Sequence, residues 1–139
     1  MTETRYGLQV NLSIPYAEAL ERATAALKQE GFGVLTTIDV KQTMKQKLDA
    51  DFRPYTILGA CNPPLAHRAL SADLEVGLLL PCNVIVYEEA PGTSVVSAIA
   101  PKAMLAAAGG SHAVDEVAKD AEVRLRRAMA ALESPGGAS

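Results

Sequence analysis

The first half of the chain switches between the two-residue alternation of a half-buried strand and the wider spacing of an amphipathic helix. Apolar and polar positions alternate over 6–12, which predicts a strand. Ser13 and Pro15 are typical of a helix start and Gly31 of a helix stop, so a helix is expected between them. Alternation returns over 32–40. The chain is therefore expected to open with a strand, a helix and a second strand.

The second half carries shorter periodic segments separated by proline, glycine and asparagine. These punctuating residues predict a hairpin and a long final helix. The expected elements, in order, are a short amphipathic turn at 41–48, a strand at 54–61, a short helix that begins at Asn62-Pro63-Pro64 and runs to Leu70, a long strand at about 78–89, a turn at 90–93, a return strand at 94–100, a helical turn at 101–108 and a long helix at 113–132.

This order of elements predicts an α+β domain in which helices cover one face of a mostly antiparallel sheet. A single domain is expected at 1–133, followed by a flexible tail at 134–139. In 84–87 and in 95–99, the residues expected to point to either face of the sheet are apolar, yet the two long helices can cover only one face of the sheet. A bare apolar face is uncommon on a monomer, so a homodimer that packs sheet against sheet is expected.

Composition and charge limit the kinds of binding partner that are expected. The chain has 139 residues, is 49% apolar and carries a net charge of −3 with both signs spread along it. It lacks the broad basic surface that binding to a phosphate backbone needs, so nucleic acid is not an expected partner. The N-terminus lacks the apolar core of a signal peptide, and the most apolar stretch, 76–87, is short for a membrane span and broken by Pro81, so a cytoplasmic location is expected. In a reducing compartment the two cysteines are expected to be free thiols or metal ligands.

Both cysteines stand beside an asparagine, and a histidine follows the first cysteine along the expected short helix. Cys61 and Asn62 lie where a strand passes into that helix, and His67 is one turn further on. Cys82 and Asn83 form the second pair. These five residues are the candidate ligand-binding residues, with Cys61 and Cys82 as the candidate catalytic ones.

Three chemical interpretations of these residues remain open. The positive end of a helix and a nearby His67 would favour a nucleophilic thiolate at Cys61, with Cys82 forming a reversible disulfide. Alternatively, Cys61, His67 and Cys82 would supply two thiolates and one imidazole to zinc or copper, with a fourth position open or filled by a partner chain. The third interpretation is that both cysteines are small buried apolar residues at strand ends.

Several strings of the sequence resemble the bacterial and archaeal domain of unknown function three-zero-two family. They are 31–32, 38–40, 55–63 with Tyr-Thr-Ile-Leu-Gly-Ala-Cys-Asn-Pro, 66–70 with Ala-His-Arg-Ala-Leu, and 77–87 with Gly-Leu-Leu-Leu-Pro-Cys-Asn-Val-Ile-Val-Tyr. The resemblance implies a TATA-box-binding-protein-like arrangement of strand, helix, four strands and helix, often seen as a dimer. It implies no established activity, and a fold name alone does not indicate DNA binding.

The sequence therefore leaves three function classes. The first is a dimeric binding module that holds a metal ion or a small ligand near Cys61, His67 and Cys82, and it ranks first because no complete catalytic set is visible. The second is a thiol enzyme or redox sensor, in which Cys61 attacks and Cys82 resolves. The third is an interaction protein whose cysteines are purely structural.

Overall fold

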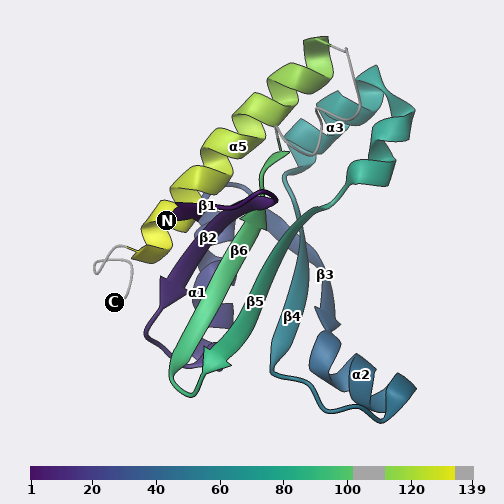
Figure 1. Cartoon of the computed structure of the whole chain (residues 1–139). Coiled ribbons are helices and arrows are strands. Elements are labelled where there is room, and N and C mark those ends of the chain that lie inside the picture. The colour runs from purple at the N-terminus through teal and green to yellow at the C-terminus, as the bar shows by residue number, and fades with distance from the viewer. Residues whose placement is uncertain (102–111, 134–139) are drawn as a thin grey trace.

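The described part of the chain forms one antiparallel sheet with helices on one side of it (Figure 1). The structure is a computed structural model, and it describes residues 1–101 and 112–133. The strands of the sheet, in sequence order, are β1 (Thr2–Glu3), β2 (Gly7–Leu12), β3 (Gly33–Asp39), β4 (Tyr55–Cys61), β5 (Cys82–Ala90) and β6 (Thr93–Ile99). The helices are α1 (Tyr16–Gln29), α2 (Val40–Leu48), α3 (Pro63–Ala72), the 3₁₀ helix η1 (Leu74–Leu79) and α5 (His112–Glu133). The spatial order of the strands is β1-β2-β6-β5-β4-β3, and every neighbouring pair is antiparallel.

The expected α+β class is confirmed. The order strand, helix, four strands, helix is formed by β2, α1, β3 to β6 and α5. The structure adds α2 and α3, at the places where a short turn and a short helix were expected, and the small strand β1. The expected tail at 134–139 and residues 102–108 of the expected helical turn lie outside the described residues.

The start of β5 corrects the sequence prediction. The strand expected from about residue 78 begins at Cys82, and the preceding apolar run is the 3₁₀ helix η1. Two causes act together: the carboxylate of Asp73 accepts a hydrogen bond from the Glu75 N–H and starts the helix, and Pro81 has no N–H to give to a strand ladder. Leu74 and Leu78 are more than four-fifths exposed, whereas Val76 between them is buried in the core, so only one side of this apolar run belongs to the core.

Helices α1 and α5 pack against each other and cover the same face of the sheet. The core lies between them and the strands, and its fully buried side chains include Leu8, Leu27, Val86 and Leu125. Helix α5 extends past the sheet, and there α3 packs on it (Figure 1). The opposite face, which is turned toward the viewer in Figure 1, carries none of the described helices.

Candidate functional site

The sequence Asn-Pro-Pro creates a sharp boundary between β4 and α3. The side chain of Asn62 accepts a hydrogen bond from the Leu65 N–H at 3.3 Å, which caps the helix. Pro63 and Pro64 suit the first turn of a helix, where the backbone N–H groups have no intrahelical partner. Asn62 itself is buried, so its capping bond is shielded from water. Cys61 is thereby fixed at the last position of the strand.

A close approach of three elements holds the returning chain against the end of β4. A Cβ atom placed on Gly59 would come within 2.1 Å of Thr36 Oγ1 and 2.9 Å of Pro81 Cγ. Only glycine leaves room for both neighbours at this point. Pro81 then leads directly into Cys82, whose position on β5 is opposite Ala60 on β4. The first residue of β5 is therefore brought beside the end of β4.

A cavity of about 350 Å³ lies at this junction, between the sheet, α3, η1 and α5. Small side chains leave the space open on three sides: Ala60 on β4, Ala66 and Ala69 on α3, and Ala121 on α5. No Asp, Glu, Lys, Arg or His occurs among the described residues that line it. The complete described lining is Phe32, Leu35, Thr36, Ala60, Cys61, Asn62, Leu65, Ala66, Ala69, Leu70, Gly77, Leu80, Pro81, Cys82, Pro101, Val117 and Ala121.

Both cysteines belong to the wall of this cavity, and both are free. Cys61 is partly accessible, whereas Cys82 is buried. Burial raises the pKa of the Cys82 thiol from 9.0 to about 11, and the negative charge of a Cys61 thiolate nearby contributes to the same rise. Cys82 is therefore a neutral thiol at physiological pH.

His67 does not join the cysteines. It lies two residues after Leu65, a rotation of about 200° around a helix, and Leu65 and Ala69 mark the buried side of α3. His67 is accordingly exposed and is not among the residues that line the cavity. Within 1–101 and 112–133, no group of three or more His, Cys, Asp or Glu residues is placed to hold a metal ion. The expected zinc or copper site of Cys61, His67 and Cys82 is not formed by the described structure.

The structure also places Asn83 apart from the two cysteines and Asn62. Successive residues of a strand point to opposite faces, so Asn83 faces away from Cys82. It is exposed and lies opposite Gly59, on the helix-free face. Of the five candidate residues, the structure brings together Cys61, Asn62 and Cys82.

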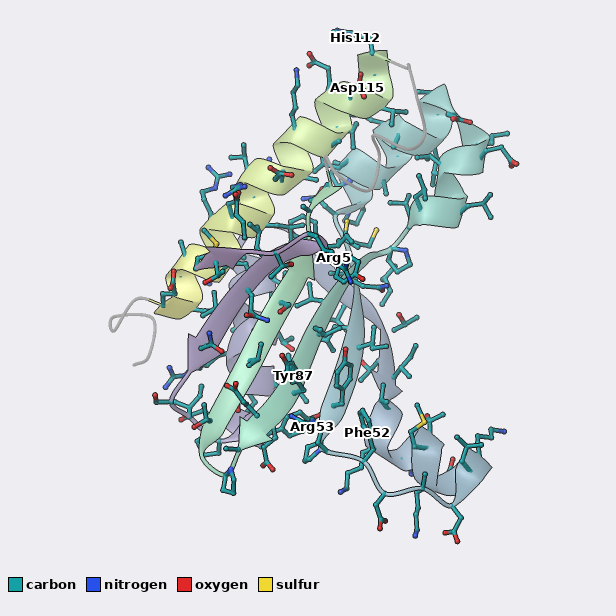
Figure 2. All side chains as sticks on the ribbon, viewed as in Figure 1. Arg5, Phe52, Arg53, Tyr87, His112 and Asp115 are labelled. Carbon is teal, nitrogen blue, oxygen red and sulfur yellow. The ribbon has the colours of Figure 1, made fainter. Side chains whose placement is uncertain are left out.

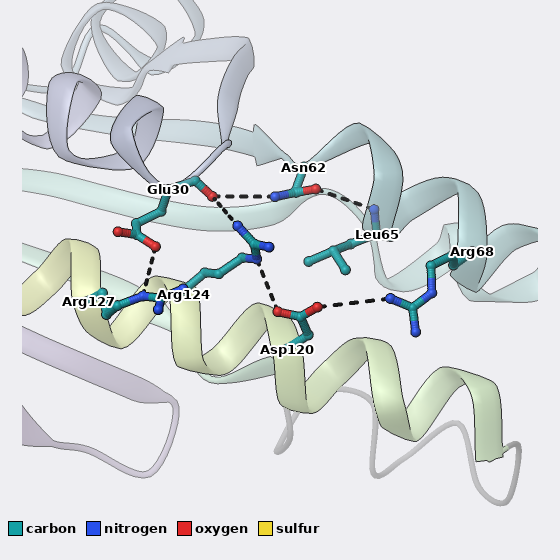
Figure 3. A network of polar contacts seen from close by, with 7 residues as sticks. All are labelled: Glu30, Asn62, Leu65, Arg68, Asp120, Arg124 and Arg127. Atoms are coloured by element: carbon teal, nitrogen blue, oxygen red, sulfur yellow. Dashed lines mark hydrogen bonds and ion pairs between the residues drawn. The ribbon is translucent and has the colours of Figure 1, made fainter.

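A polar network that the sequence prediction missed ties α3 to the two long helices (Figure 3). The backbone carbonyl of Glu30, at the end of α1, accepts hydrogen bonds from Asn62 Nδ2 at 3.4 Å and Arg124 Nη1 at 3.5 Å. Arg124 also donates from Nε to Asp120 at 3.0 Å, and Asp120 lies 3.9 Å from Arg68 on α3. A cation near the carboxyl end of α1 is favourable for the helix dipole. The network positions the helix that forms one wall of the cavity.

The helix-free face has a different chemistry. Three of the four tyrosines lie there, Tyr6, Tyr55 and Tyr87, and Phe52 packs on Tyr55 with ring centroids 6.0 Å apart. Tyr55 and Tyr87 are stacked on neighbouring strands, with centroids 5.4 Å apart and planes 11° apart. Figure 2 shows Tyr87 near the middle of this face, with Arg5 toward one end of the sheet and Arg53 toward the other.

A second, smaller concavity of about 270 Å³ lies on the helix-free face. Its lining mixes aromatic, amide, hydroxyl and aliphatic side chains: Thr4, Tyr6, Gly7, Gln9, Asn83, Ile85, Tyr87, Ser97, Ala98 and Ile99. The two hollows are thus on different sides of the sheet and present different chemistry.

The longest described helix, α5, carries ion pairs along its surface. Arg127, for example, lies 2.9 Å from Glu30 at the end of α1. Among the described residues, no helix combines the length and the apolar character needed to cross a bilayer.

The fold and the cavity together define a class: a small α+β domain with an antiparallel sheet, helices on one face and an apolar hollow at the end of the sheet. The chain belongs to the family described as "Domain of unknown function DUF302", whose pattern matches residues 8–132. It is similar to an uncharacterized conserved DUF302 protein from Bacillus stearothermophilus of known crystal structure, with 36% sequence identity and a TM-score of 0.81. That similarity covers 91% of this chain and 98% of the other. A comparison with curated proteins finds no match.

Proposed function

We propose that this protein is a binding module that holds a small, uncharged and mainly apolar ligand in the cavity beside Cys61 and Cys82. The observation that carries the proposal is the cavity itself, which has a volume of about 350 Å³ and an apolar lining without charged side chains among the described residues. Burying a charged ligand group in such a site would be costly, because the described lining offers no opposite charge to pair with it.

The size and the lining support a specific pocket rather than a packing defect. Small-molecule pockets have volumes of about 300–1,000 Å³ and combine apolar walls with a few placed polar groups. The polar residues among the described lining are Asn62, Thr36 and the two cysteines. The lining favours a ligand with an apolar body and at most one or two neutral polar atoms.

Binding of Nile red, an uncharged apolar dye, tests the proposal. Replacing Ala66 with Phe places a ring in the cavity and is expected to weaken dye binding at least tenfold, which corresponds to about 1.4 kcal/mol. Ala72→Phe is the matched control, because Ala72 is on the same helix but is exposed and outside the lining. Fluorescence titration of the three proteins gives the affinities, and thermal unfolding confirms that each variant is folded.

Two outcomes would count against the pocket. One is saturable dye binding that Ala66→Phe leaves unchanged. The other is equal weakening by Ala66→Phe and Ala72→Phe, since a dye held on the outside of α3 would respond to both.

We also infer that the helix-free face pairs with a second copy of the chain. The face concentrates tyrosines and carries arginines at its ends, and these residue types are enriched where protein interfaces derive most of their energy. Ile85 and Tyr87 alternate with the buried Val84 and Val86 on the same strand, so both faces of β5 are apolar. Sheet-to-sheet packing would cover the second face.

Sedimentation equilibrium measures this association. Ile85→Arg places a charge near the middle of the helix-free face and is expected to shift the equilibrium to monomers. Thr43→Arg on the exposed helix α2 is the control and should leave it unchanged. A wild-type chain that stays monomeric across the accessible concentration range would rule out the pairing and leave the ligand pocket unaffected.

A further inference from the structure

The cavity brings together the only two thiols of the chain. They come from different strands and are 21 positions apart in the sequence, so their shared position depends on the fold. Neither cysteine forms a disulfide. Within the described residues, neither belongs to a group of side chains that could hold a metal ion. A pair of free thiols on one wall has a chemistry that a single cysteine lacks, because one sulfur can react with the other.

The strand register makes Cys61 on β4 and Cys82 on β5 diagonal neighbours. Ala60 and Cys82 are directly opposite each other, and Cys61 follows Ala60. Opposed residues of an antiparallel pair have Cα atoms about 4.5–5.5 Å apart, and one further step of about 3.3 Å along the strand puts a diagonal pair at roughly 6 Å. A disulfide spans Cα separations of about 4.4–6.8 Å, so this pair falls in the upper part of that range. In a regular strand Cys61 would point away from Cys82. Both residues stand at strand ends, however, and both are among the residues that line the same cavity.

The two thiols differ in a way that assigns them different roles. Cys61 is the more accessible sulfur, so a reagent that enters the cavity meets it first. Cys82 is buried, and its raised pKa keeps it protonated. Burial is the larger cause of that rise, and the charge of a Cys61 thiolate is the smaller one. Its burial assigns Cys82 the second role, that of the thiol which reacts after Cys61 has been oxidised.

The geometry points to an oxidisable dithiol, in which Cys61 is oxidised by a hydroperoxide and Cys82 then closes an intramolecular disulfide across β4 and β5. In the first step the Cys61 sulfur attacks the peroxide, an S–O bond forms, the O–O bond breaks, and the leaving oxygen departs as an alcohol or water after taking a proton. In the second step the Cys82 sulfur attacks the sulfenic acid, the S–S bond forms, the S–O bond breaks, and water leaves. Two thiols are oxidised and one hydroperoxide is reduced.

This reaction goes beyond the binding function and does not require it. A disulfide in the cavity wall would draw the ends of β4 and β5 together beside Asn62 and Ala66. Oxidation is therefore expected to change the space that a ligand can occupy, which would make the pocket responsive to peroxide.

Cumene hydroperoxide, an uncharged and apolar oxidant, is the probe. The reduced full-length chain is treated, alkylated and analysed by intact mass and by tryptic peptides, which separate the two cysteines because Arg68 lies between them. The expected result is the loss of both thiols, a mass lower by two hydrogen atoms, and a linked peptide pair that dithiothreitol releases. In Cys82→Ala, the Cys61 sulfenic acid should persist and be trapped by dimedone. In Cys61→Ala, Cys82 should remain a thiol.

Three results would overturn the dithiol. They are oxidation of Cys61 to the sulfinic acid in the wild-type chain with no linked peptides, a disulfide found only between two chains, and oxidation of Cys82 in Cys61→Ala at the wild-type rate. Peptide mapping of the wild-type chain distinguishes the linked from the unlinked product even if a variant does not fold. The dye titration of the reduced protein is a separate measurement, so failure of the dithiol and failure of the pocket can be distinguished.

Discussion

The two faces of the sheet both carry apolar side chains, but these side chains are buried to different extents. On β4, Leu58 points to the helices and is buried, whereas its neighbour Ile57 points to the helix-free face and remains half-exposed. The helix side is apolar and filled, except at one end, where small residues leave a cavity next to two thiols. The helix-free side is aromatic and amide-rich, with a smaller hollow. The comparison shows that a strand with apolar residues on both of its faces can bury one face in the core and leave the other half-exposed.

Truncating each of these neighbours gives the sharpest test of the difference. Leu58→Ala removes three buried carbons and is expected to lower the free energy of unfolding by about 3 kcal/mol, whereas Ile57→Ala should cost about 1 kcal/mol in the monomer. Urea denaturation at low protein concentration measures both. Equal losses would mean that the helix-free face is as well packed as the core within a single chain.

If the chain forms a dimer, the same two variants should also differ in how their stability depends on protein concentration. Because the proposed interface covers Ile57, the cost of Ile57→Ala should grow with protein concentration, while the cost of Leu58→Ala should not. A concentration-independent cost at Ile57 would contradict sheet-to-sheet pairing.

The buried thiol makes the helix side sensitive to alkaline pH. The pKa of Cys82 is raised to about 11 in the folded chain, so between its ordinary value of 9.0 and 11 the unfolded chain loses a proton that the folded chain retains. Stability from this group is fully present below pH 9 and is lost as the pH rises to 11, by about 2–3 kcal/mol at most. The free energy of unfolding of Cys82→Ala should depend less steeply on pH over this window than that of the wild type.

Tyrosines also titrate in this range, which makes the choice of control important. Burial raises the pKa of Tyr55 on the helix-free face, in the same direction as that of Cys82. The difference between wild type and Cys82→Ala removes the tyrosine contribution. If the two pH profiles run parallel, Cys82 is not held as a buried neutral thiol.

The two asparagines that follow the cysteines give the smallest expected effect. Asn62→Ala removes the cap of α3 and the bond to the Glu30 carbonyl, and is expected to cost about 1–2 kcal/mol. Asn83→Ala, on the exposed face, should change stability by no more than about 0.5 kcal/mol. Thermal unfolding of both variants compares them, and similar losses would show that the network of Figure 3 does not hold α3 in place.

The sequence predicts those parts of the fold that depend on local signals. Alternation and helix-boundary residues locate β2, α1, β3 and α5, and Asn62 is recognisable as a cap because Pro63 and Pro64 follow it. The predicted start of β5 is wrong because an apolar run suits a strand and a 3₁₀ helix equally well. The two-residue strand β1 is too short to produce a periodic signal.

The site is predictable only in part, for the same reason. Cys61 and Cys82 stand out by their residue type, and pairing of β4 with β5 brings them to one cavity. His67 is close to Cys61 in the sequence, although its angle around α3 turns it outward. The alanines that create the cavity cannot be recognised beforehand, since a small residue marks a hollow only when its neighbours in space are known. Arg124 and Glu30 are visible in the sequence only as charges near helix ends.

The two edges of the sheet differ in how readily they could pair with an additional strand. At one border, β2 is partly shielded by β1, whose two residues allow only a brief pairing. At the other border, β3 presents a seven-residue outer edge that no described strand occupies, and its residues are nearly all exposed, including Leu35 and Ile38. Such an edge is a template for unintended strand addition. At high protein concentration, we expect fibrous self-assembly to begin at β3. Placing a charge on this edge by Thr37→Lys is expected to reduce aggregation during storage.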